Sequence, residues 1–74
     1  MKDPQAIANE VFAITAFGAM AFRKHEDAIR MAMDKTIQEL YNKGVPIIVI
    51  SMLVDNAKAA VMAQIDGYSK VRGI

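Results

Sequence analysis

The chain has 74 residues, of which 54% are hydrophobic and none is cysteine, and its formal net charge is +1. This balance excludes the strong positive field that steers a protein onto nucleic acid or anionic lipid, and the lack of cysteine excludes disulfides and most zinc sites. A domain this short buries only about 60 to 65% of the surface that its unfolded chain exposes. We therefore expect self-association to complete its core.

Two apolar runs raise the question of a membrane span. Residues 11–22 and 45–54 contain no charge, but they are 12 and 10 residues long, whereas a spanning helix needs about 20. Asp3 and Glu10 are acidic where a signal peptide would be basic. The lack of cysteine fits a reducing cytoplasm and is equally allowed outside it. We therefore expect a cytoplasmic protein without a membrane span.

The first predicted helix covers about residues 4–22. Asp3 is a favourable N-cap, and Pro4 has no amide to leave unsatisfied in the first turn. Apolar residues then fall on two opposite faces of a helical wheel. The first face has Ile7, Val11, Ile14, Phe17 and Ala21, and the second has Phe12, Ala16 and Ala19. Because the helix is apolar on nearly every side, we expect it to be buried on nearly every side. Phe12 is left over once one core has been built on the first face.

The second predicted helix covers about residues 27–43. The five polar residues at 23–27 would surround a helix completely, so they cannot all face a core. They form either a turn between two helices or the exposed middle of one long helix over residues 4–43. The apolar stripe of the second segment consists of Ile29, Met33, Ile37 and Leu40. Met31 lies off this stripe.

The third predicted helix covers about residues 46–67. Gly44 and Pro46 mark its beginning, because glycine adopts a left-handed cap conformation and proline cannot extend the preceding helix. Its apolar stripe consists of Ile47, Ile50, Val54, Ala57, Val61, Ile65 and Tyr68. Ile48 and Met52 lie off the stripe. The β-branched residues within 47–51 also fit a strand that pairs with a second chain.

Together these elements predict an all-α fold and one domain over residues 1–74. The expected architecture is a small bundle or hairpin of two to three helices, completed by oligomerisation. Apolar residues left outside the core are the predicted protein-interface residues. They are Phe12, Met31, Ile48 and Met52. The expected function is non-enzymatic: association with a second copy, or with another protein as its adaptor or inhibitor.

No motif in the sequence indicates catalysis or a cofactor. His25 is the only histidine, and Ile29 stands where a zinc-protease motif would place its second histidine. The four glycines, at positions 18, 44, 67 and 73, are too scattered for a phosphate-binding loop. We therefore expect no catalytic residue, no cofactor and no metal.

Residues 40–65 suggest an alternative function. Ile50 and Ser51 are an apolar–small pair, Asp55 falls at a turn position, and Val61 takes a buried position. On these residues the segment resembles the helix-turn-helix of small site-specific recombinases and repressors. The resemblance implies a DNA-binding regulator with two short helices and a turn near Asp55. Its implied base contacts are Asn56, Lys58 and Gln64. Because few basic residues are available for phosphate contacts, nucleic acid is the weaker candidate partner.

Overall fold

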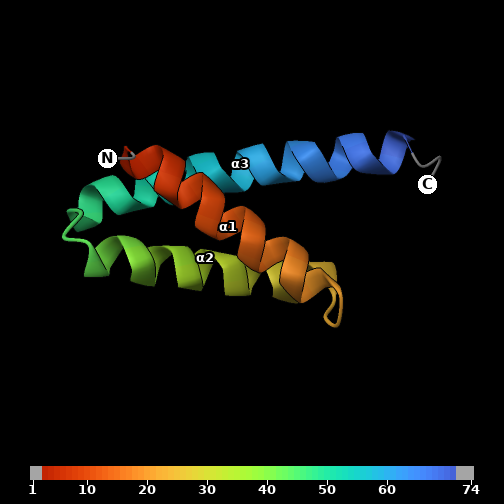
Figure 1. Ribbon diagram of the computed structural model, residues 1–74, viewed down its shortest axis with the longest axis horizontal. Coiled ribbons are helices and arrows are strands. Elements are labelled where there is room, and N and C mark those ends of the chain that lie inside the picture. The colour runs from red at the N-terminus through yellow and green to blue at the C-terminus, as the bar shows by residue number, and fades with distance from the viewer. Residues whose placement is uncertain (1–2, 72–74) are drawn as a thin grey trace.

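Three α-helices form the computed structural model, which describes residues 3–71 and the side chains of residues 3–67. They are α1 (Pro4–Met20), α2 (His25–Asn42) and α3 (Ile47–Val71). In Figure 1, α2 and α3 run in opposite directions, and α1 crosses obliquely from α3 to α2. The predicted all-α fold is confirmed, with three helices packed against one another. Residues 47–51 are helical, so the predicted alternative of a strand there is wrong.

The beginning of α1 and the first connection follow from local chemistry. Asp3 caps α1, because its Oδ1 accepts a hydrogen bond of 3.0 Å from the backbone amide of Ala6. The helix ends at Met20, and residues 21–24 form an exposed turn before α2 begins at His25. Of the two alternatives that the sequence leaves open, the structure therefore has the turn.

The second connection is a glycine-capped helix end. The amide of Gly44 donates to the carbonyl of Tyr41 over 3.0 Å, and the amide of Val45 donates to the carbonyl of Leu40 over 3.1 Å. This is the pattern of a Schellman motif, in which the residue after the cap is left-handed. Gly44 has a φ of 85°, a conformation that costs glycine little. The predicted boundary at Gly44 is confirmed.

The helices pack through a core that is rich in alanine. Phe12, Leu40, Val61 and Thr36 are its largest fully buried side chains. Buried alanines come from all three helices, and small side chains allow helix axes to approach closely. They are Ala8, Ala16 and Ala19 in α1, Ala28 and Ala32 in α2, and Ala57 in α3.

The predicted core face of α1 is wrong, because the opposite face packs inward. Phe12 is completely buried, whereas Ile14 is 67% exposed and Phe17 also lies at the surface. When a helix is apolar on nearly every side, a helical wheel does not indicate which face packs against the core. The inward face has alanines on both sides of Phe12, so α1 can lie close to its neighbours while one aromatic ring fills the centre. Phe12, predicted as an interface residue, is therefore a core residue.

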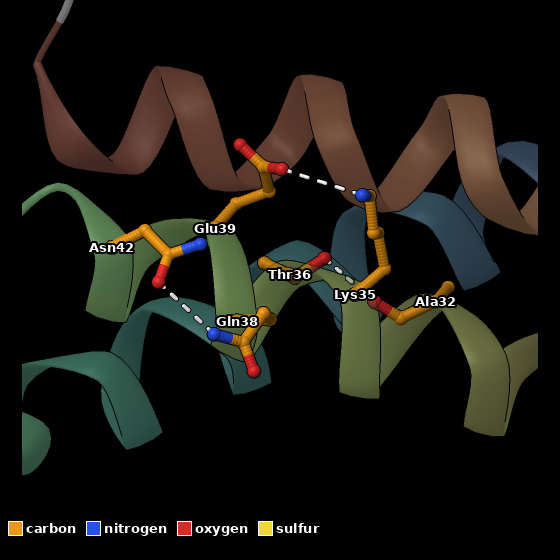
Figure 2. A network of polar contacts seen from close by, with 6 residues as sticks. All are labelled: Ala32, Lys35, Thr36, Gln38, Glu39 and Asn42. Carbon is orange, nitrogen blue, oxygen red and sulfur yellow. Dashed lines mark hydrogen bonds and ion pairs between the residues drawn. The ribbon is translucent and has the colours of Figure 1, made fainter.

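Side-chain hydrogen bonds involving Gln5 join α1 to α3, whereas a second group of polar contacts lies within α2. Figure 2 shows those of α2, where Thr36 Oγ1 donates to the carbonyl of Ala32 over 2.7 Å. Its exposed side carries Lys35 Nζ at 3.4 Å from Glu39 Oε1, and Gln38 Nε2 donating to Asn42 Oδ1 over 3.0 Å. These polar contacts of α2 all join residues of that helix, so they stabilise α2 itself. Apolar contacts pack α2 against the other two helices.

Candidate interaction surfaces

Large apolar side chains remain exposed on every helix. We distinguish the outer face of α1, the outer face of α3, and the groove between α2 and α3. The exposed residues, including Phe22 of the first connection, are Ile14, Phe17, Phe22, Met31, Ile37, Tyr41, Ile47, Ile48 and Met52. Single exposed apolar residues are ordinary, but groups of them mark interaction sites.

The outer face of α1 consists of Ile14 and Phe17, which follow each other by three residues and so lie on the same side of the helix. Phe22 continues the apolar surface into the first connection, where the guanidinium carbon of Arg23 lies 5.8 Å from its ring centroid. The only charged side chain of α1 is Glu10. This face is therefore apolar with almost no charge.

The outer face of α3 contains two of the predicted interface residues. Ile48 is 88% exposed and Met52 is also exposed. They lie four residues apart on one helix, so the structure brings them together. Met31 is exposed as well, but it belongs to α2 and does not line the groove with α3. With Phe12 buried, the four predicted residues form no single patch.

The groove between α2 and α3 is a surface that the sequence did not predict. It consists of two hollows that share Met33 and Ile37 and are therefore continuous. Its apolar floor combines residues of both helices. They are Ile29, Met33 and Ile37 from α2, with Ile47, Ile50, Val54 and Met62 from α3.

The edges of this groove are charged. Arg30 and Asp34 contribute from α2, and Asp55 and Lys58 contribute from α3. All four residues are exposed, and within the described part of the chain none of them makes an ion pair. Asp34 lies eight residues before the end of α2 and Asp55 eight residues after the beginning of α3, whereas Arg30 and Lys58 lie twelve and eleven residues from those ends. Because the two helices run in opposite directions from a short connection (Figure 1), the aspartates lie at about one level and the basic residues about one turn further from the connection. Arg30 and Lys58 therefore make one level of the groove basic, and the two aspartates make the next level acidic. Glu26 of α2 adds an acidic side chain one turn before Arg30.

The helix-turn-helix geometry implied by the resemblance is wrong. Helix α3 continues from Ile47 to Val71, so the chain does not turn at Asp55. No glycine or proline occurs between Ile47 and Asp66 to stop the helix. Of the three implied base contacts, Asn56 is bonded to Gln5 of α1, Lys58 lines the groove, and Gln64 is exposed. They are placed by one long helix rather than by a recognition helix.

Over Ile47–Gly67, helix α3 is long enough and apolar enough to cross a membrane. Only 28% of the apolar window within it is buried in the bundle. Counting uncharged runs missed this segment, because Asp55 and Lys58 interrupt it. The absence of a membrane span thus stays a prediction.

The described side chains contain no group of three or more His, Cys, Asp or Glu residues that fits a metal ion. Comparison of the chain with protein-family models, with curated proteins and with solved structures gives no match. Its own surfaces are therefore the basis for any functional assignment.

Proposed function

We propose that this chain is a non-enzymatic helical protein that acts by protein–protein association, either with a second copy of itself or as an adaptor or inhibitor of another protein. One observation carries the proposal: each of the three helices exposes large apolar side chains. Ile14 and Phe17 share one face of α1, and Ile48 and Met52 share one face of α3. A monomeric soluble protein seldom exposes contiguous apolar patches beyond a few hundred Å².

The energetics of a small domain support the same proposal. Removing an exposed Ile, Phe or Met from water contributes about 1.5 to 3 kcal/mol when its burial is complete. Six of the thirteen buried apolar residues are alanines, which contribute less, and domains of this size have only a small free energy of unfolding. Association would therefore add a substantial share of the stability of the folded chain.

Light scattering coupled to size-exclusion chromatography tests self-association. Between about 1 and 100 μM, a range suited to modest interfaces, we expect the mass to rise above the 8.1 kDa of one chain. For association with another protein, a photo-crosslinking residue is placed at Ile14 or Ile48, with the exposed polar position Gln38 as control. A chain that stays monomeric, with no crosslinks at either apolar position beyond the control, would contradict the proposal.

A second candidate function is binding to a lipid surface, and the exposed apolar length of α3 favours it. Flotation with phosphatidylcholine vesicles, with and without anionic lipid, tests this candidate. Vesicle binding that is lost on Ile48→Asp would support it. A chain that stays entirely in the dense fraction with both kinds of vesicle would exclude it.

DNA binding, the alternative function suggested by residues 40–65, is tested separately. It predicts a mobility shift with duplex DNA that weakens steeply with salt and is lost on Lys58→Glu. The absence of a shift at low salt would remove this alternative.

A further inference from the structure

The charges at the edges of the α2/α3 groove are arranged so that they can complement those of the same groove on a second copy. Arg30 precedes Asp34 by one turn in α2, and Asp55 precedes Lys58 by one turn in α3. Since the helices are antiparallel and joined by a short connection, the distances of the four residues from that connection place both basic residues at about one level and both acidic residues one turn nearer the connection. None of the four is paired within the described part of the chain.

We propose that a second copy of this chain docks onto the α2/α3 groove, related to the first by a two-fold axis that crosses both helices. The axis passes between Arg30 and Asp34 on α2, and between Asp55 and Lys58 on α3. This inference rests on the proposed function and names its partner and its surface. The two helix pairs then form a four-helix layer, with α1 of each copy on the outside.

This axis brings opposite charges together. It sets α2 antiparallel against the same helix of the second copy, so Arg30 faces the partner's Asp34. In the same way, α3 lies antiparallel to its equivalent, so Lys58 faces the partner's Asp55. Symmetry repeats each pair, so all four charges of each copy gain an opposite charge across the interface.

A two-fold axis parallel to the helices gives the opposite result. It would place α2 against the partner's α3 at the same level, so Arg30 would face the partner's Lys58. The aspartates would also face each other, and like charges disfavour such a complex. Charge therefore selects one of the two symmetric arrangements.

The groove also has the size of a modest dimer interface. An 18-residue helix such as α2 is about 27 Å long, and the bundle is 20 Å across its short axes. The face of one copy is therefore roughly 500 Å², and two faces reach the roughly 1,000 Å² expected of a specific interface. Ile37, which is 42% exposed on this face, would become buried.

The other apolar faces give no comparable reason for choosing a second copy as partner. The outer face of α1 offers no pair of opposite charges, because Glu10 is the only charged residue of that helix. On the outer face of α3, Ile48 and Met52 likewise have no basic residue within one turn of them. A hollow lined by Ile7, Glu10, Val11, Glu39 and Lys43 also has charges of both signs, but Glu10 and Glu39 already have interactions. Among the hollows of the described residues, the α2/α3 groove therefore combines an apolar floor with charges of both signs that make no ion pair.

Sedimentation equilibrium of charge variants tests the arrangement. We expect Lys58→Asp to weaken dimerisation about tenfold or more, because each Asp at position 58 would face the partner's Asp55. Asp55→Lys alone should have a similar effect for the converse reason. The double variant Asp55→Lys/Lys58→Asp restores opposite charges across the axis, so its dissociation constant should return to within about threefold of the original.

Two apolar variants locate the interface. Ile37→Asp places a charge in the groove and should abolish the dimer, whereas Ile48→Asp on the outer face of α3 should leave it intact. Far-UV circular dichroism at low concentration checks that each variant is still helical, and the charge swap remains decisive should Ile37→Asp unfold the chain.

The outcomes separate this inference from the proposed function. A dimer that survives Ile37→Asp, or that the charge swap fails to restore, overturns the groove arrangement. If Ile14→Asp or Ile48→Asp abolishes the dimer instead, association is real but uses another face. A wild-type chain that stays monomeric at about 100 μM overturns the inference, and the crosslinking experiment then decides whether association with another protein stands.

Discussion

Asn56 of α3 donates a hydrogen bond of 3.0 Å from its side-chain nitrogen to Oε1 of Gln5, which lies 51 positions earlier in α1. The Nε2 of the same glutamine donates to the carbonyl of Leu53 and to Oδ1 of Asn9, each over 3.0 Å. One amide group therefore fixes the first turn of α1 against the first half of α3. This link between helices also engages Asn56, which the helix-turn-helix resemblance had assigned to DNA.

Replacing Gln5 with alanine should lower the free energy of unfolding by about 1 kcal/mol, because two hydrogen bonds between α1 and α3 are lost. Urea denaturation followed by circular dichroism at about 1 μM protein, where association adds little, measures the change. Gln38→Ala is the matched control. Its hydrogen bond stays within α2 and is exposed, so it should change stability by less than about 0.5 kcal/mol. Equal effects of the two variants would contradict the interhelical role of Gln5.

Phe12→Ala should destabilise the chain by about 3 to 5 kcal/mol, because it removes the buried ring at the centre of the core and leaves a cavity. Ile14→Ala should cost less than about 1 kcal/mol, since that side chain is mostly exposed. Thermal and urea unfolding of both variants measures the difference. If Ile14→Ala destabilised the chain more than Phe12→Ala, the face of α1 that contains Ile14 would be the one that packs against the core.

Gly44→Ala should destabilise by about 1 kcal/mol, because a β-carbon is strained at a φ of 85°. The comparison is Gly18→Ala in the last turn of α1, where a Cβ would meet no heavy atom within 4 Å. That change should stabilise by up to about 1 kcal/mol, because alanine is the better helix former. Changes of the same sign would contradict the Schellman cap.

Thr36→Val should change stability by less than about 1 kcal/mol. Its hydroxyl bonds to a carbonyl of its own helix, and the substituted methyl group occupies nearly the same volume. Thr36→Ser keeps the hydroxyl but removes a buried methyl group, so it should cost more than Thr36→Val. A larger loss for valine, measured by the same urea titration, would show that the hydroxyl contributes more than the methyl group.

The ends of the helices could be predicted because single residues determine them. Asp3 with Pro4 and Gly44 with Pro46 each favour a specific backbone geometry, and the structure has helix boundaries at both places. By contrast, Gly67 alone does not end α3, because glycine weakens a helix without blocking its hydrogen bonds. The side chain of Tyr68, predicted to continue the apolar stripe, lies outside the described residues.

The orientation of α1 could not be predicted, because both of its faces are apolar. Choosing between Ile14 and Phe12 depends on how closely α2 and α3 approach, and a wheel of one helix contains no information about that distance. The groove was missed for a related reason. The spacing of Arg30 and Asp34, and of Asp55 and Lys58, is visible in the sequence, but their alignment appears only once α2 and α3 are packed side by side.

The two short connections, at residues 21–24 and 43–46, have a kinetic consequence. Closing loops of this length costs little entropy, and small helical bundles fold within microseconds to milliseconds. Two folded copies at about 10 μM would meet much more slowly, over about 10 ms to 1 s at ordinary association rates. A rapid refolding experiment should therefore resolve a fast phase that is independent of protein concentration, followed by a slower phase whose rate increases with it.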